Sequence, residues 1–148
     1  MIVTIADLGK TALYPEIITK ITRGDADAAN LQILAAESFV RSYMSKYDLD
    51  AIFGTATTAP TFTGADVELI KQLIKTIAVY YLARLSSPNI NIELARADFE
   101  DAHTWLKDLQ KGEVNPSLPY KQDDANTPMD EGNVGVSWDS NIKRTNFF

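Results

Sequence analysis

The residues with the most obvious chemical potential form a short run near the start of the chain. Leu8-Gly9-Lys10-Thr11 contains the glycine, lysine and threonine that end a phosphate-binding loop. The full loop requires another glycine at position 4, where this chain has Thr4, and a glycine-rich turn between a strand and a helix. Because both are missing, we interpret the run as a chance match.

Two groups of acidic residues have the appearance of cation sites. Asp48-Leu49-Asp50 is similar to the start of a calcium loop, but Ile52 and Phe53 follow where the loop needs an oxygen ligand and a glycine. We therefore predict capping or turn roles for these acids. Asp123-Asp124 and Asp130-Glu131 are predicted to belong to a solvated acidic tail.

His103 is the only histidine of the chain, and there is no cysteine. A lone histidine cannot form a multi-histidine metal site, and the absence of cysteine excludes thiolate ligands and disulfides. No serine or cysteine is placed by the sequence as a nucleophile beside it. We predict that His103 is a surface or boundary residue, and we expect no catalytic site, no metal and no cofactor.

The composition narrows the class of protein. The chain has 148 residues, of which 45% are hydrophobic and 23% charged, as is typical of one globular domain with its own core. Its net charge of −6 argues against sequence-specific nucleic-acid binding, which needs a basic surface. No run approaches the roughly 20 apolar residues of a membrane span, and no secretory signal begins the chain. We therefore expect a soluble protein.

Residues 63–85 are predicted to form the helix that organises the fold. Apolar side chains recur there in steps of three and four, at Val67, Ile70, Ile74, Ile77, Tyr81 and Leu85. Thr63 and Asp66 have the spacing of a capping box, and Pro88 sets the end of the helix. So wide an apolar stripe must be covered by other helices.

Three helical segments are predicted before this one. Thr4 and Asp7 form a capping-box pattern ahead of a short turn around Leu8, and a second short helix runs from Pro15 to Gly24. Asp25 or Asp27 caps a third, which we predict to continue to about Tyr47. Its apolar face consists of Ala29, Ile33, Ala36, Val40, Tyr43, Met44 and Tyr47. The charged residues predicted to fall outside that face are Glu37, Arg41 and Lys46.

The connection at 48–62 carries Ile52, Phe53 and Phe62, so we expect it to fold over the end of the bundle. Asn89 or Asn91 is predicted to cap a last long helix, which Gly112 ends. Its heptad-like apolar positions are Ile92, Ala95, Phe99, Ala102, Leu106 and Leu109, with Leu94 and Trp105 widening the stripe.

The chain changes character after Gly112, so we divide it into a helical bundle, 1–112, and an extended C-terminal arm, 113–148. The arm contains prolines and glycines and only a weak strand pattern at Val134–Trp138. Aromatic residues in such a segment can anchor it to a partner. The predicted partner-binding residues are Trp138, Lys143, Arg144, Phe147 and Phe148. The alternative, equally weighted, is that the aromatic ones fold back on the bundle.

Residues Ile17–Pro119 resemble the Mu-like prophage head–tail connector family, long catalogued as a phage domain of unknown function. The resemblance on the third helix rests on Asp25, Ala36-Glu37, Ser42-Tyr43 and Lys46-Tyr47. On the central helix it rests on Ile77-Ala78-Val79-Tyr80, and on the last helix on Asp98–Leu106 with Lys111-Gly112. The apolar spacing matches the family, whereas Thr76, Val79 and Asp98-Phe99 replace residues that are charged or aromatic there.

This resemblance implies a small helical adaptor that forms a ring beneath the portal and joins capsid to tail. The implied partners are other copies of the chain, the portal protein and neck or tail completion proteins. The implied location is the neck of the virion, and the host cytoplasm during assembly. An alternative from a different class is a regulatory module that holds a peptide or small ligand in a groove of the bundle. The sequence therefore predicts an all-α bundle of four to five helices that carries the extended arm and is not an enzyme.

Overall fold

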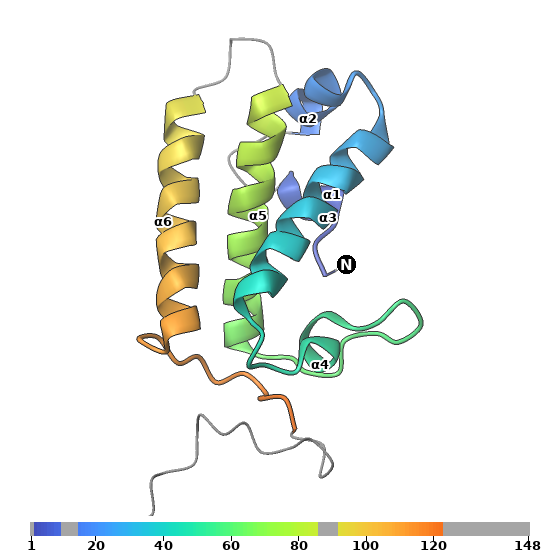
Figure 1. The fold of residues 1–148 in the computed structure, drawn as a ribbon. Helices are drawn as coiled ribbons and strands as arrows, with labels where there is room; N and C mark the ends of the chain where they lie inside the picture. Colours follow the sequence, from blue (N-terminus) through green and yellow to red (C-terminus); the bar gives the residue numbers. More distant parts are fainter. Residues whose placement is uncertain (1, 10–14, 86–91, 123–148) are drawn as a thin grey trace, which may run out of the picture.

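A long central helix, α5 (Ala65–Leu85), has a long helix on either side of it, α3 (Ala26–Tyr43) and α6 (Ile92–Lys111) (Figure 1). The computed structural model describes residues 2–9, 15–85 and 92–122. Within these ranges the chain is all-α, as predicted, and pairs in β fashion only at an isolated bridge between Tyr47 and Tyr120. The six helices are α1 (Ile5–Leu8), α2 (Pro15–Thr22), α3 (Ala26–Tyr43), α4 (Leu49–Phe53), α5 (Ala65–Leu85) and α6 (Ile92–Lys111).

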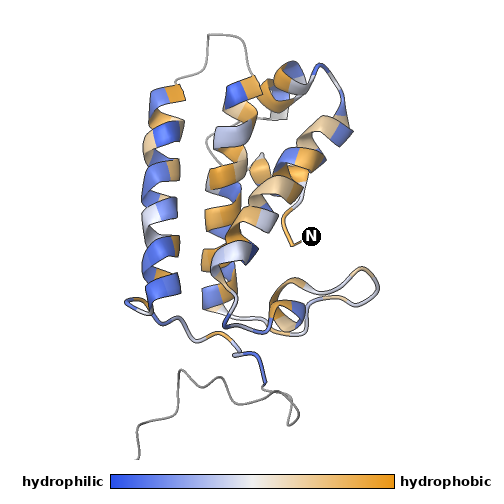
Figure 2. Cartoon of the chain, viewed as in Figure 1, coloured by the Kyte–Doolittle hydropathy of each residue, from blue (hydrophilic) through white to orange (hydrophobic). Residues whose placement is uncertain are grey.

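The core lies where the three long helices meet. α5 contacts α1, α2, α3 and α6, which confirms the predicted organising role of this segment. Figure 2 shows apolar residues concentrated on α5 and on the sides of its neighbours, while α6 is largely hydrophilic. The side chains with no exposed surface include Ile33, Ile70, Ile74, Ile77 and Leu106. Burying each such side chain contributes about 1.5–3 kcal/mol to stability.

Helix ends follow the predicted chemistry at four places. The Asp25 carboxylate accepts hydrogen bonds from the backbone N–H groups of Asp27 and Ala28, at 2.9 and 3.3 Å, and so caps α3. At α1 the Asp7 carboxylate reaches back to the Thr4 N–H, at 2.9 Å. Gly24 and Gly112 follow α2 and α6 with φ of +81° and +84°, as helix-ending glycines do.

The third helix is shorter than predicted. It ends at Tyr43, because Met44 leaves helical geometry (φ −105°, ψ 29°), and the chain then turns. Tyr47 is nevertheless 3% exposed, since its ring stacks on that of Tyr120 with centroids 5.0 Å apart. The turn leads into α4, a helix not predicted as such, which the Asp48 carboxylate caps through the Ala51 N–H at 3.0 Å. Ile52 and Phe53 of α4 are buried, which confirms that this connection covers the bundle end.

The predicted cap of the central helix is wrong by one residue. α5 begins at Ala65, and the Gly64 carbonyl accepts from the N–H groups of Val67 and Glu68, so Gly64 occupies the cap position assigned to Thr63. The Asp66 carboxylate does not close a capping box. It accepts a 2.8 Å hydrogen bond from the Ser117 N–H and so ties α5 to the segment after α6.

The apolar stripe of the last helix is narrower than predicted. Ala95, Ala102, Leu106 and Leu109 are buried, but Ile92 and Leu94 are 44% and 59% exposed. The predicted caps Asn89 and Asn91 lie outside the described residues.

Glu37 is the one charged residue whose predicted position is reversed. Its side chain lies in the interior at 2% exposure instead of on the outer face of α3. There it accepts a hydrogen bond from the Ile2 N–H at 3.0 Å, which ties the start of the chain to α3.

The first residues of the predicted arm contact the bundle. Leu118 is 5% exposed, and the Pro119 carbonyl accepts from the Asp48 N–H at 2.8 Å. Lys121 donates its N–H to the Lys46 carbonyl at 3.0 Å. Residues 113–122 therefore run across the end of the bundle, and the division at 112 and 113 stays a prediction. The weak strand pattern at Val134–Trp138 lies outside the described residues.

Candidate interaction surface

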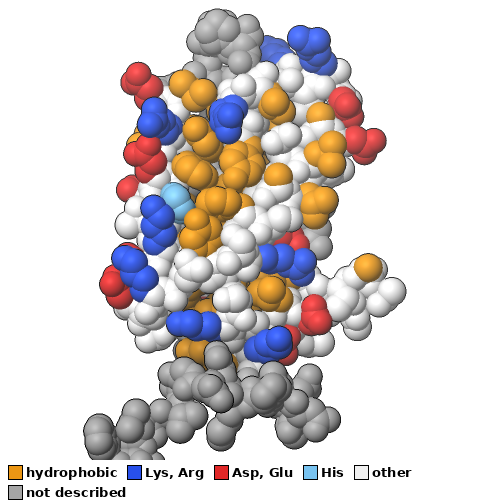
Figure 3. All heavy atoms as spheres, viewed as in Figure 1, with side chains coloured by type: hydrophobic (Ala, Val, Ile, Leu, Met, Phe, Trp, Pro, Cys, Tyr) orange, Lys and Arg blue, Asp and Glu red, His pale blue; other side chains and the backbone are white. Residues whose placement is uncertain are grey.

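Six aromatic side chains from three helices form one continuous, half-buried surface, which we call the aromatic face. Phe99 of α6 stacks on Tyr80 of α5 with ring centroids 4.6 Å apart, and it lies 5.9 Å from Phe39 of α3. The full set is Phe39, Tyr43, Tyr80, Tyr81, Phe99 and His103. Figure 3 shows hydrophobic side chains gathered on this side of the molecule, with the histidine at their edge. None of the six is fully buried, so the face offers apolar area to a partner.

His103 joins the two outer helices at this face. Its Nε2 lies 2.8 Å from the Tyr43 hydroxyl, and its ring lies within the range of edge-on contact with Phe39 and Tyr43. Partial burial, and then the nearby positive charge of Lys107, hold the pKa of His103 below its ordinary value. The prediction that His103 is a surface or boundary residue is confirmed. The structure also shows that its ring packs against α3.

The lowered pKa of His103 predicts a loss of stability in acid. The unfolded chain takes up the proton at about pH 6.5, whereas the folded chain resists it. The stability that the neutral His103 ring contributes is therefore fully present above pH 6.5 and is lost as the pH falls through the pKa of the folded state. A single histidine makes the measurement simple, because its ring protons titrate alone in an NMR experiment. A folded-state pKa above that of a short unfolded peptide around His103 would contradict the prediction.

Basic side chains surround the aromatic face. The Arg84 guanidinium lies 5.9 Å from the centroid of the Tyr80 ring. Arg96 and Lys107 stand on α6 on the same side as His103, at steps of seven and four residues. Arg96 is ion-paired to Glu100 at 2.9 Å with both side chains largely exposed. Arg84, Arg96 and Lys107 outnumber Glu100 beside this face, so the local charge is positive although the sequence as a whole is acidic.

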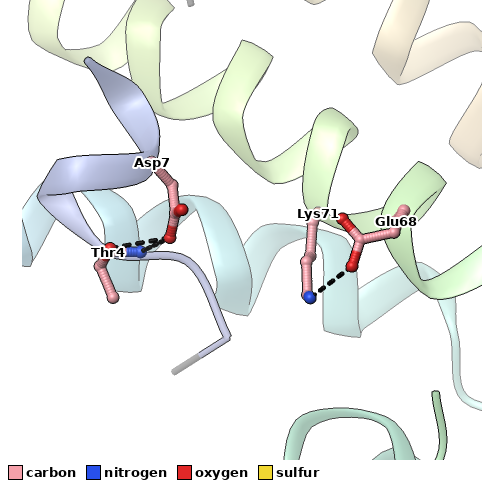
Figure 4. Close-up of polar contacts among 4 residues, drawn as sticks. All are labelled: Thr4, Asp7, Glu68 and Lys71. Atoms are coloured by element: carbon pink, nitrogen blue, oxygen red, sulfur yellow. Dashed lines mark hydrogen bonds and ion pairs between the residues drawn. The ribbon is translucent and has the colours of Figure 1, made fainter. Parts of the chain in front are cut away.

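A separate cavity of about 360 Å³ lies beside α4 and the start of α5. Its apolar lining comes from Ile2, Ile52, Phe62 and Val67, and Glu68 and Lys71 border it as an ion pair at 2.6 Å. Figure 4 shows this pair on α5 and the Thr4–Asp7 cap contact on α1. The cavity is large enough for a small ligand. The charges of Glu68 and Lys71 at its border cancel, so they favour neither an anionic nor a cationic ligand.

The partner-binding residues predicted from the sequence lie outside the described residues. These are Trp138, Lys143, Arg144, Phe147 and Phe148. Within residues 2–9, 15–85 and 92–122, no three His, Cys, Asp or Glu side chains are grouped to hold a metal ion. Over the same ranges, none of the helices has the length and apolar character needed to cross a membrane.

Comparisons of the chain with protein-family models, with curated proteins and with solved structures gave no match.

The aromatic face was only partly visible in the sequence. Tyr43 and Phe99 were predicted as core positions, whereas Phe39 was not singled out. The signal that could have found it is the spacing of four residues in both Phe39–Tyr43 and Phe99–His103, which places each pair on one side of its helix. The spacing does not show that the two pairs face each other across α5.

Proposed function

We propose that this protein is a head–tail connector, a non-enzymatic virion protein that forms a ring at the portal vertex and links capsid to tail. The observation that supports it best is the exposure of large apolar side chains on the outward sides of two different helices. Leu31 and Leu34 of α3 are 61% and 49% exposed, and Leu94 of α6 is 59% exposed. A ring is built from head-to-tail contacts, which need two different and complementary surfaces on each copy.

Two sequence properties support the same proposal. The resemblance to the Mu-like connector family extends over all three long helices. The net charge of −6 suits a channel wall along which DNA must slide without binding. In this proposal the bundle, with residues 113–122 packed across its end, acts as a rigid wedge. The rest of the predicted arm, 123–148, supplies the further contacts to neighbouring copies or to the portal.

The proposal is tested by co-expression with the portal protein encoded in the same genome. We expect a complex with several copies of this chain for each portal ring, seen by mass measurement and electron microscopy. A deletion of residues 133–148 is predicted to leave the helical circular dichroism unchanged and to abolish that complex, because it removes all five predicted partner-binding residues. A truncated chain that still assembles on the portal would remove the arm from the mechanism. A full-length chain that never binds the portal would overturn the connector proposal.

The cavity beside α4 favours a second candidate, a module that binds a small apolar ligand. The 360 Å³ lined by Ile2, Ile52 and Phe62 lies within the size range of ligand pockets. This candidate predicts saturable binding of an apolar dye by a monomer, and loss of binding in Val67→Trp, which fills the cavity. A connector without this activity would show no saturable binding in either form.

A further inference from the structure

Helix α6 carries a second stripe on the flank opposite to His103. Leu94, Asp98, Asp101, Trp105 and Asp108 follow one another in steps of four and three residues, which places them along one side of the helix. Leu94, Asp98 and Asp101 are exposed, and Trp105 and Asp108 are half-buried. We call this set the acidic stripe. It combines three carboxylates with two large apolar side chains.

The acidic stripe and the aromatic face have opposite charges, and both carry large apolar side chains. The face has Arg84, Arg96 and Lys107 around its rings, and the stripe has three aspartates around Leu94 and Trp105. The two surfaces lie on different flanks of α6, so one copy cannot bring its own stripe onto its own face. A second copy can do so without any change in the fold.

We propose that the aromatic face binds the acidic stripe of a second copy of this chain. The inference rests on the proposed connector function, because it names two surfaces that would join neighbours in the ring. Of the exposed leucines that support that function, Leu94 belongs to the stripe, and Leu31 and Leu34 lie outside both surfaces. Leu94 and Trp105 of one copy then cover Phe39, Tyr80 and Phe99 of the next. Since the two surfaces differ, each paired copy keeps the surface that it has not used, so the pair still offers one face and one stripe, and the contact repeats until a ring closes.

Existing ion pairs oppose this contact only weakly. Arg96 pairs with Glu100, and Asp108 pairs with Lys111 at 3.7 Å, but each of these pairs is largely or partly exposed. Isolated surface pairs contribute about 0–1 kcal/mol, so exchanging them for contacts across an interface costs little. The interface charges instead set which surfaces meet and in what register.

Charge reversal tests the contact with the full chain. The stripe variant carries Asp98→Lys and Asp101→Lys, and the face variant carries Arg84→Glu and Lys107→Glu. We expect each to raise the dissociation constant of self-association on the order of 100-fold, because like charges then meet. The four changes combined in one chain restore opposite charges and should restore self-association. Sedimentation equilibrium from micromolar to millimolar concentration measures all three, and circular dichroism checks that each variant is folded.

The control variant is Glu16→Lys with Asp50→Lys, which changes the net charge as the stripe variant does but on α2 and α4, where both residues are exposed. It should associate like the wild type. A wild-type chain that stays monomeric at millimolar concentration overturns the inference, as does association that ignores the reversals or fails to return in the combined variant. Portal binding by a chain that shows any of these results would disprove the self-contact and leave the connector function standing.

Discussion

Glu37→Ala is expected to destabilise the fold by about 3 kcal/mol, because it removes a buried charged acceptor and leaves its two partners uncompensated. The Glu37 carboxylate is 2% exposed and accepts from the Ile2 N–H at 3.0 Å, and its other oxygen lies 3.8 Å from Arg41 Nε. Removing it leaves the Ile2 N–H without this acceptor and Arg41 without its counter-charge. Urea unfolding followed by circular dichroism measures the loss.

Arg41 is the reason that the effect should spread beyond α3. Its guanidinium donates to the Gly54 carbonyl at 3.2 Å and lies 4.7 Å from the centroid of the Phe53 ring. Its Nε is buried and has no hydrogen-bond partner among the described residues, so the nearby charge of Glu37 is what compensates it. One charged pair therefore holds α4 and the segment before α1 to the same helix.

Two companion variants separate charge from packing. Glu37→Gln keeps the shape and one oxygen acceptor, so it should cost about 1–2 kcal/mol. Ser38→Ala, on the exposed side of the same helix, should change stability by less than about 0.5 kcal/mol. The double variant Glu37→Ala with Arg41→Ala should lose less stability than the two single variants lose together, because the second change removes the uncompensated charge. A Glu37→Ala variant as stable as Ser38→Ala would show that the pair does not support the fold.

The misplacement of Glu37 also shows what the sequence could not predict. Helical periodicity predicted the three long helices, because the apolar faces of α3, α5 and α6 each repeat in steps of three and four. Glu37 follows Ala36 and precedes Val40, both buried, so it lies on the edge of the apolar face. A carboxylate at such an edge is normally solvated. It is buried here because an N–H from 35 residues earlier meets it, and no local pattern contains that contact.

The same limit applies to the candidate surface. The aromatic face needs Phe39 and Tyr43 to meet Phe99 and His103, some 60 residues apart, across a helix that contributes Tyr80 and Tyr81. Each helix predicts its own side, but the relative rotation of the helices is decided by packing in the core. The apolar spacing of α6 also did not predict that Leu94 is exposed. The predicted apolar stripe is wider than the neighbouring helices can cover.

Gly54→Ala is expected to destabilise the fold by about 3 kcal/mol, through backbone strain and steric overlap together. Gly54 has φ +74° and ψ 175°, a conformation almost confined to glycine. A Cβ there would lie 2.5 Å from the Thr58 carbonyl oxygen and 2.9 Å from the Pro60 nitrogen, both backbone atoms that cannot rotate away.

Two other glycines separate these contributions, and urea unfolding of the three variants measures them. Gly24 has φ +81° but no atom within 4 Å of the position that a Cβ would take, so Gly24→Ala should show the backbone cost alone, about 1–2 kcal/mol. Gly64 has neither a left-handed φ nor a close neighbour, so Gly64→Ala should cost less than about 1 kcal/mol, the difference between glycine and alanine at a helix cap. The expected order of loss is Gly54, then Gly24, then Gly64. Equal losses at Gly54 and Gly24 would mean that the 55–60 loop moves to accept the methyl group, and that its close approach to Gly54 does not hold the loop against α4.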